Sequence, residues 1–442
     1  MNNESMTTGK PYKHIIKFFL PVFFGLLLQQ LYNTVDTIVV GRYAGELSLS
    51  AVGTTGSFTY LFLALATGFS AGNGVLVSQN YGGENQEGVR KSAATGVLFL
   101  IILGIALSIF GILISYPAFK YFLNVPNSFI DKTLIYFNIY SLGLIFQYGY
   151  NIIASILRAI GDSASTLYFL LISSIINIFL DIFFVANLNM GVQGAAIATV
   201  ISQAISFVAS YIYMTKKYVI FRFKLNEYIL DKIIVKKTIN IGLPISMQLI
   251  VVSMGLTFIQ RAVNTFGQIM TASFTVGQRI EQYIMLPCNA FQTTLATYTG
   301  QNFGAKKIDR IKLGAIQTII ISLFMTLLIS LTLLVFAKDI VLFFGLSGIS
   351  FLYAVEHIKT VAIINIVLAA YIPLFGVFQG TGHSKLPMFV VCVALFVRVS
   401  VTYLLRYSNF LGYKIIWWNG IFGFGIGFFI SWWFYITEKW KN

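Results

Sequence analysis

Long apolar runs, separated by short polar gaps, fill almost the whole chain. A bilayer-spanning helix needs about 20 mostly apolar residues, and the runs are at least that long. They lack the ten-residue alternating pattern of a membrane β-barrel. The pattern therefore predicts an all-α polytopic membrane protein with twelve transmembrane helices. The expected spans are 15–41, 50–79, 92–117, 133–157, 165–187, 192–214, 238–264, 270–298, 313–336, 354–379, 386–405 and 415–437.

Several short motifs of the first half recur in the second half, in the same order and at a nearly constant spacing. The matched positions are Leu20-Pro21 with Leu243-Pro244, the tetrapeptide at Gln79 with that at Gln301, Gly161 with Gly382, and Gly191 with Gly412. We therefore expect two repeats of six helices. Because six is even, the repeats are parallel, which is typical of transporters that move one half against the other.

The distribution of charge sets the domain limits and the orientation. Of the 442 residues, 57% are hydrophobic and 10% charged, which excludes a soluble fold of this length. The net charge of +15 comes from Lys and Arg in the gaps between spans, so we expect no nucleic-acid partner. These residues concentrate on one side, which predicts cytoplasmic termini in the plasma membrane. The largest basic gap, 216–237, is interpreted as a cytoplasmic linker between an N-terminal lobe, 1–215, and a C-terminal lobe, 238–442.

Three acidic residues, Asp36, Asp181 and Glu281, fall well inside predicted spans. An acid at mid-bilayer costs about 2.5 to 3.5 kcal/mol and indicates function. Asp36 and Asp181 are expected at the same depth in the outer half, with Asn177 one turn before Asp181 and Thr199 at a similar depth. Two facing carboxylates must share a proton or hold a cation. The sequence predicts a site for H⁺ or Na⁺ here, with interhelical hydrogen bonding as the alternative.

Glu281 has different surroundings, because basic residues are near it in the sequence and in the repeat. Its candidate partners are Arg261, Arg279 and Arg398, so it forms either a structural ion pair or part of a site for a cationic substrate or a second proton. Arg398 occupies the repeat position of Asn177, and Thr402 occupies that of Asp181. The second half has therefore lost the acidic pair.

The chain resembles the multidrug and toxic compound extrusion (MATE) family over both halves. The likeness rests on LPVFFGLLLQQLYNTVDTIVVGRYAG, SQNYGG and its twin GQNFGA, ILRAIGDS and FQGTGHS, and NIFLD followed by GVQGAAIAT. The resemblance implies a V-shaped pair of lobes and, in the DinF-like prokaryotic branch, a cation site. The residues that match that site are Asp36, Asn177, Asp181 and Thr199, completed by the carbonyl of Ala195.

The resemblance also suggests that Pro21 bends the first helix on protonation. A proline leaves one helical carbonyl free, so either a hinge or a static kink fits. Polar side chains inside the spans are candidates for a substrate cavity, with interhelical bonding as the alternative role. These candidates are Gln30, Asn33, Gln147, Tyr148, Asn151, Gln260, Gln278, Glu281 and Gln282.

The sequence favours a secondary active exporter of lipophilic, often cationic compounds, coupled to H⁺ or Na⁺ and acting by alternating access. No GxxxxGK[ST] segment for ATP is present, and we expect no catalytic residues, no cofactor beyond the coupling ion, and a monomer. One alternative is a flippase for lipid-linked saccharides or precursors from the same superfamily. That activity would need a more cationic cavity than these spans provide. The other alternative is a channel or a receptor that does not transport.

Overall fold

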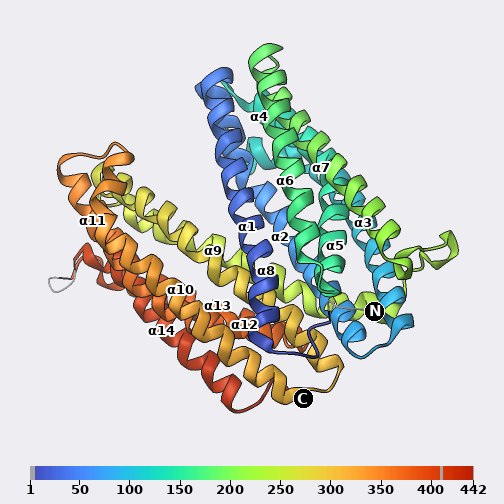
Figure 1. The fold of residues 1–442 in the computed structure, drawn as a ribbon. Helices are drawn as coiled ribbons and strands as arrows, with labels where there is room; N and C mark the ends of the chain where they lie inside the picture. Colours follow the sequence, from blue (N-terminus) through green and yellow to red (C-terminus); the bar gives the residue numbers. More distant parts are fainter. Residues whose placement is uncertain (1–4, 409–411, 442) are drawn as a thin grey trace. The chain divides into compact units, whose positions relative to one another are not determined.

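The computed structural model describes residues 5–408 and 412–441, and in this part of the chain all regular structure is helical (Figure 1). Fourteen α-helices are formed in the described residues. Their bounds are α1 Pro11–Val39, α2 Glu46–Gly82, α3 Gln86–Pro117, α4 Ile130–Leu142, α5 Leu144–Ala159, α6 Ser163–Asp181, α7 Gly191–Lys217, α8 Lys232–Asn264, α9 Gln268–Gly304, α10 Ile308–Phe343, α11 Gly348–Ala369, α12 Ile372–Gly380, α13 Lys385–Leu405 and α14 Lys414–Ile436.

Ten helical segments in the described residues are long and apolar enough to cross a membrane. Two of the twelve predicted spans are not among them. The span 133–157 is divided into α4 and α5, and the span 270–298 lies in α9, which is long but carries many polar side chains. The span 354–379 is likewise divided, into α11 and α12.

The break between α4 and α5 lies where α7 approaches closely. A Cβ atom on Gly143 would lie 2.5 Å from Cγ2 of Val200, so only glycine allows α7 to approach here. In the other divided span, Tyr371 leaves the helical conformation with φ −135°, and a proline stands in the first turn of α12. Proline at that position is preorganised for a helix start.

Three helices in the first half end in π-helical turns. α1 continues as η1 (Val40–Ala44), α3 as η2 (Ala118–Phe122) and α6 as η3 (Ile182–Asn187). The described residues of the second half contain no such turn. π-Helical turns are rare and occur frequently at functional sites.

Side-chain caps begin two helices of the first half. The Asn85 side chain accepts a hydrogen bond from the backbone N–H of Gly88 (3.0 Å) at the start of α3. Asp162 accepts one from the backbone N–H of Ser165 (3.1 Å) at the start of α6. Each cap provides an acceptor for an N–H that has no partner inside the helix.

The chain packs into two compact units. Of the described residues, unit 1 contains residue 5 and residues 20–246, and unit 2 contains residues 6–19, 247–408 and 412–441. The unit boundaries therefore fall inside α1 and α8, beside Pro21 and Pro244. They differ from the lobe limits predicted from the repeat, because the start of α1 packs with unit 2 and the linker packs with unit 1. The lobes as separately moving bodies remain a prediction.

Unit 1 packs its helices through small residues and a large aromatic cluster. α2 and α3 both pack on α5. The Ser155 hydroxyl donates to the Ser70 carbonyl (2.7 Å), at the point where a Cβ on Gly74 would lie 2.3 Å from that hydroxyl. α6 and α7 run side by side (Figure 1), and these two helices position most of the acidic site described below.

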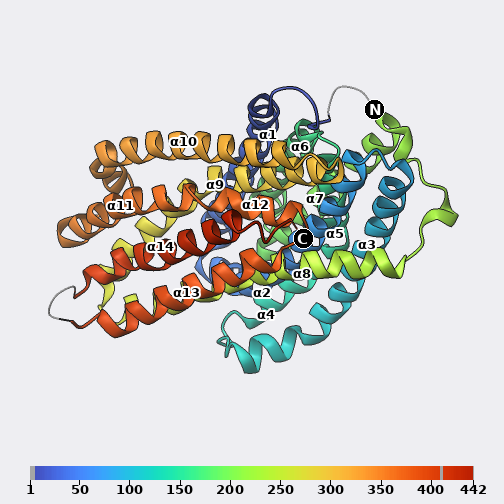
Figure 2. The ribbon, with the colours of Figure 1, turned by 90° about the horizontal axis from the view of Figure 1, so that it is seen from below.

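Unit 2 also packs its helices closely through small residues. α12 lies against α9, where a Cβ on Gly376 would come within 2.4 Å of the Gln292 carbonyl oxygen. α13 and α14 run side by side in both views (Figures 1 and 2). These helices, with α9 and α11, surround a small cavity.

An arginine in each unit holds the segment that leads into a long helix. In unit 1, Arg90 donates to the carbonyls of Ile220 (2.7 Å) and Arg222 (2.5 Å) in the linker before α8, and pairs with both carboxylate oxygens of Glu227 (2.5 and 2.6 Å). In unit 2, Arg310 donates to the carbonyls of Met6 (3.0 Å), Thr8 (3.0 Å) and Gly9 (2.8 Å) in the segment before α1. Arg310 also donates to an amide, Oδ1 of Asn302 (3.1 Å), so neutral oxygens take the place that a carboxylate has beside Arg90.

Candidate functional site

Asp36 and Asp181 meet inside unit 1. Asp36 lies on α1, four residues before the π-helical turn η1, and Asp181 is the last residue of α6, directly before η3. Asp181 is 0% exposed and Asn177, one turn earlier on α6, is 2% exposed. The carboxyl groups of Asp36 and Asp181 interact electrostatically with each other. Two acids that lie far apart in the sequence therefore share one site, in which Asp181 is fully buried and Asp36 is half-buried.

The polar atoms of this site lack partners. Within residues 5–408 and 412–441, no donor from another residue reaches Oδ1 of Asp36, either polar atom of the Asn177 amide, or either oxygen of Asp181. The two carboxyl groups are close enough to hydrogen-bond to each other when one of them carries a proton. Leaving a polar group buried and unpaired costs free energy, and a buried charge costs far more. The site can recover this cost by binding a proton or a small cation, for which carboxylate and amide oxygens are suitable ligands.

The other two predicted ligands lie on α7. The Thr199 hydroxyl donates to the Ala195 carbonyl (3.0 Å), so both oxygens belong to one turn of the helix. An apolar cluster packs this part of α7 against the end of α1, since Ala195 and Ala196 share it with Val39 and Val40. The role of Thr199 as a cation ligand remains a prediction.

Two tyrosines beside the acids were not expected from the sequence. Tyr32 on α1 and Tyr136 on α4 each interact electrostatically with both Asp36 and Asp181. Tyr136 stacks on Tyr140, with ring centroids 6.4 Å apart. Tyr32 lies one turn before Asp36 on the same helix face, and this spacing could have predicted from the sequence that Tyr32 is a neighbour of the acid. Their hydroxyls add hydrogen-bonding groups next to the acidic pair.

The candidate cavity residues of the first half have mixed placements. The Gln147 amide donates to the Tyr140 hydroxyl (3.0 Å), and the Asn151 amide donates to the Gln147 carbonyl (2.8 Å). Gln30 is half-buried and Asn33 is exposed. Tyr148 is completely buried and donates to the Phe62 carbonyl (2.8 Å), so the structure places it in the packed core rather than on a cavity surface.

The candidates of the second half lie on α8 and α9. The Gln260 amide donates to Oδ1 of Asn264 (2.9 Å), one turn later on the same helix. Gln278 is half-buried and Gln282 is exposed. A substrate cavity formed by these side chains remains a prediction.

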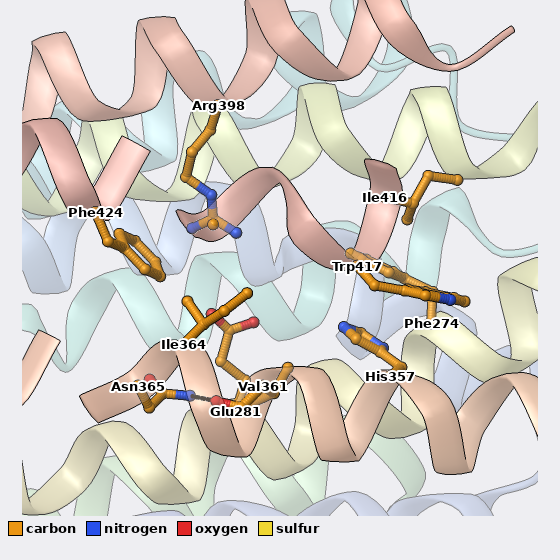
Figure 3. A pocket seen from close by; sticks show the side chains of 11 residues that line it. Phe274, Glu281, His357, Val361, Ile364, Asn365, Arg398, Ile416, Trp417 and Phe424 are labelled. Carbon is orange, nitrogen blue, oxygen red and sulfur yellow. Dashed lines mark hydrogen bonds between the residues drawn. The ribbon is translucent and has the colours of Figure 1, made fainter. Parts of the chain in front are cut away.

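Glu281 lines a small cavity in unit 2 together with Arg398 (Figure 3). Of the three arginines that the sequence offered as partners, Arg398 is the one that lines this cavity and interacts electrostatically with Glu281. The cavity walls come from α9, α11, α13 and α14. Glu281 therefore belongs to an enclosed site within one unit.

The family model of MatE matches this chain twice, at residues 21–183 and 244–404. The two matches cover most of both halves. The chain belongs to the MatE family. Each half of this MatE protein matches the same model, in agreement with the internal repeat, and the family is one of transporters rather than enzymes.

Several curated relatives align with this MatE protein over nearly its whole length. The probable multidrug resistance protein YpnP of Bacillus subtilis is 26% identical over 429 residues, which are 97% of this chain and 94% of the relative. The probable multidrug resistance protein NorM of Thermotoga maritima is 24% identical and covers 97% of this chain and 93% of its own. The multidrug export protein MepA of Staphylococcus haemolyticus is 23% identical over 85% of this chain and 82% of its own.

Solved structures of MATE transporters share the fold. A MATE crystal structure in complex with MaL6 superposes with a TM-score of 0.94 at 22% identity, covering 99% of this chain and 98% of the other. A multidrug resistance MATE family transporter of the MOP superfamily, in an outward-facing conformation, gives a TM-score of 0.93 at 22% identity, with coverage of 99% and 98%. The predicted fold class, an all-α polytopic membrane protein, is confirmed.

Proposed function

We propose that this MatE protein is a secondary active multidrug exporter of the DinF-like branch, in which H⁺ or Na⁺ entering the cell drives the export of lipophilic, often cationic compounds. The observation that carries the proposal is the meeting of two acids, Asp36 and Asp181. Oδ1 of Asp36 and both oxygens of Asp181 are buried and receive no hydrogen bond from another residue in the described structure. The names of the relatives, which are multidrug resistance and export proteins, support the substrate class.

The acidic pair explains how an ion could drive transport. Two carboxylates that face each other in a low-dielectric interior repel, so the site is unstable when both are charged and no cation is bound. Binding of H⁺ or Na⁺ removes this repulsion and stabilises a conformation in which α1 and α6 close around the ion. Asn177, Thr199 and the Ala195 carbonyl would supply further oxygen ligands.

Pro21 supplies the flexible point in α1. It lies next to the place where α1 passes from unit 2 to unit 1, and its ring removes one helical hydrogen bond. Straightening and bending at this residue would couple ion binding near Asp36 to alternating access. The protein would work as a monomer in the plasma membrane with both termini in the cytoplasm.

The test is dye export from proteoliposomes under an imposed pH gradient or an imposed Na⁺ gradient. We expect one gradient to drive dye against its concentration, and we expect Asp36→Asn to reduce that transport to the rate of protein-free liposomes. Asp131→Asn changes an exposed acid of the first half and is the matched control, with transport like that of the wild type. If neither gradient moves dye, drug export is refuted, and lipid-linked precursors become the substrates to test.

A further inference from the structure

The linker between α7 and α8, residues 218–231, packs firmly on unit 1. It contains two short 3₁₀ turns and runs beside α3 in both views (Figures 1 and 2). Phe221 is 0% exposed and belongs to the hydrophobic core of unit 1. Three more linker side chains pack against that core, namely Ile220, Phe223 and Tyr228. Together with the hydrogen bonds from Arg90, these contacts give the linker a fixed conformation on the helices.

Other side chains of the linker are apolar and yet exposed. The exposed fraction is 92% for Leu225, 68% for Val219 and 64% for Ile229. Ile233, in the first turn of α8, is 68% exposed. Because the linker is held in place by its buried residues, this exposure is a property of the folded chain. Exposed apolar side chains that are grouped in this way mark a surface for another protein or for a membrane.

A hydrogen bond to α3 shows how deep the linker reaches. The Thr95 hydroxyl donates to the Ile229 carbonyl (3.0 Å). Thr95 lies about 14 Å along α3 from its first residue, at the 1.5 Å rise of an α-helix. It also follows Lys91, after which the chain has no charged residue before Lys120. Ile229 is therefore level with the beginning of the apolar part of α3, where a membrane span meets the headgroup region.

The linker and the helix turns beside it, residues 216–237, carry an excess of positive charge, with seven basic and two acidic residues. Both acids are used inside the protein. Glu227 forms the ion pair described above, and Asp231 accepts hydrogen bonds from the backbone N–H groups of Ile233 (2.8 Å) and Ile234 (3.1 Å). Five of the basic residues are exposed lysines that take part in none of the ion pairs of the described residues. They are Lys216, Lys224, Lys232, Lys236 and Lys237.

We propose that the linker lies on the surface of the bilayer and binds anionic phospholipids, with its lysines at the lipid phosphates and its exposed apolar side chains among the acyl chains. Segments that lie in the interface combine basic and apolar side chains in this way, and basic residues next to a span are attracted to anionic lipids. The level of Ile229 favours lipid over an acidic soluble protein, because such a protein would have to displace lipid to cover it. The inference goes beyond drug export, since it concerns a surface and its partner.

The test uses a fluorophore attached to Asn226→Cys in the full-length protein, in nanodiscs of phosphatidylcholine and phosphatidylglycerol. Asn226 is exposed, and labelling it leaves the lysines and the apolar side chains unchanged. A trace of either lipid, carrying a nitroxide near its headgroup, quenches a label that lies close to it. We expect both lipids to quench, with phosphatidylglycerol enriched about fivefold at the label, and we expect high salt to reduce this enrichment. The unsubstituted protein gives the background from the two native cysteines.

Three results would overturn the proposal. If neither lipid quenches the label, the linker does not lie on the bilayer. If both lipids quench equally, the lysines do not select anionic headgroups. If inorganic phosphate at millimolar concentration removes the enrichment, the lysines form a site for soluble phosphate groups and not for a lipid.

A triple variant of the linker assigns the enrichment to the lysines. Lys224→Gln, Lys232→Gln and Lys236→Gln together should reduce it about threefold or more. The control removes the same number of charges from exposed positions outside the linker and should keep the wild-type enrichment. It combines Lys338→Gln, Lys359→Gln and Lys414→Gln. Full enrichment in the linker variant would contradict the proposal. No gradient is needed for these measurements, so their outcome is independent of ion-driven dye export.

Discussion

The two halves have polar side chains at matching positions of the repeat, but the charges of these side chains differ. The first half has Asp36, Asn177 and Asp181. The corresponding positions of the second half hold Ile259, Arg398 and Thr402. Ile259 and Thr402 are completely buried, so one acid has been replaced by an apolar side chain and the amide by a cation. Within the described residues, the first site has two acids and no basic side chain beside them, whereas the second holds both an acid and a base.

This difference indicates how one architecture can support two chemistries. A site with unbalanced negative charge needs a mobile cation, and its stability therefore depends on ion occupancy. A site with fixed opposite charges has no such need. The following changes test the comparison, beginning with the largest expected effect.

Replacing Asn177 by the arginine found at the matching position of the second half should abolish the coupling of ion entry to export. Asn177→Arg gives the first site the side chain that the second has at that position. An arginine there would pair with Asp181 and Asp36 and take the place of the coupling ion. We expect gradient-driven dye export to fall about a hundredfold or more, while the melting temperature stays equal to or above that of the wild type.

The control for this exchange is Asn187→Arg, at an exposed position in η3. It adds the same charge to the same stretch of chain outside the site, and its export should remain near the wild-type rate. Normal export by Asn177→Arg would show that the acidic site does not hold a coupling ion, and the contrast between the two halves would lose its functional meaning.

A smaller effect should follow from filling the space under Arg398. Gly423→Ala places a Cβ 2.3 Å from Cγ of Arg398 and 2.4 Å from the Ala394 carbonyl oxygen. Such overpacking costs about 1 to 3 kcal/mol, which a lowered melting temperature would report. At the matching position of the first half, the chain already carries a side chain, that of the buried Ser202. The control is Gly425→Ala on the same helix, where an added Cβ meets nothing within 4 Å; equal stability of the two variants would contradict the expectation.

The smallest effect concerns the arginines that hold the segments before α8 and α1. The pKa of the Glu227 carboxyl is lowered from 4.5 to about 2 by hydrogen bonds from the Arg90 guanidinium and from the backbone N–H of Lys224. A lowered pKa means that the contact stabilises the fold above about pH 4.5 and is lost as the pH falls toward 2. Glu227→Gln should therefore lower the melting temperature by about 1 °C at pH 7, and this difference should shrink at pH 3.

Arg310 provides the comparison, because its hydrogen bonds go to carbonyls and an amide that do not titrate in this range. His14 interacts electrostatically with Arg310 and gains a proton as the pH falls from 7 to 3, so the comparison is made in a His14→Gln background. There the effect of Arg310→Gln on the melting temperature should be the same at pH 7 and pH 3. A pH-independent effect of Glu227→Gln would show that the carboxylate is not the group that matters in the linker contact.

Hydropathy and the repeat predicted most of the fold, because membrane spans are set by runs of apolar residues. The breaks at Gly143 and Tyr371 could not be read from the same signal, since the apolar pattern continues through both. The first break coincides with the approach of Val200 from another helix, a tertiary contact. The π-helical turns were missed for a similar reason, because no local composition distinguishes them from the helices that they extend.

The acidic site was partly predictable, since Asp36 and Asp181 are costly in a membrane and share a depth. Tyr32 and Tyr136 were not predicted because tyrosine is an ordinary residue in such helices, and only their position beside the acids gives them meaning. The repeat drew attention to Arg398, but the cavity around it depends on four helices and on the stacking of His357 with Trp417. That geometry depends on how the helices pack, which the sequence pattern does not specify.

The π-helical turn η1 marks a difference in length between the two repeats. Gly45 and Gly267 are equivalent residues, with φ of +83° and +87°, that precede α2 and α9. The stretch from Pro21 to Gly45 is one residue longer than the stretch from Pro244 to Gly267. In a regular α-helix, one extra residue would turn every later side chain by about 100° about the helix axis. A π-helical turn closes an i→i+5 hydrogen bond and so contains one residue more than an α-helical turn. η1 therefore accommodates the extra residue. The two copies therefore differ by a single insertion or deletion at this point. The π-helical turn η1, which accommodates it, begins one turn after Asp36, an acid that the second copy lacks.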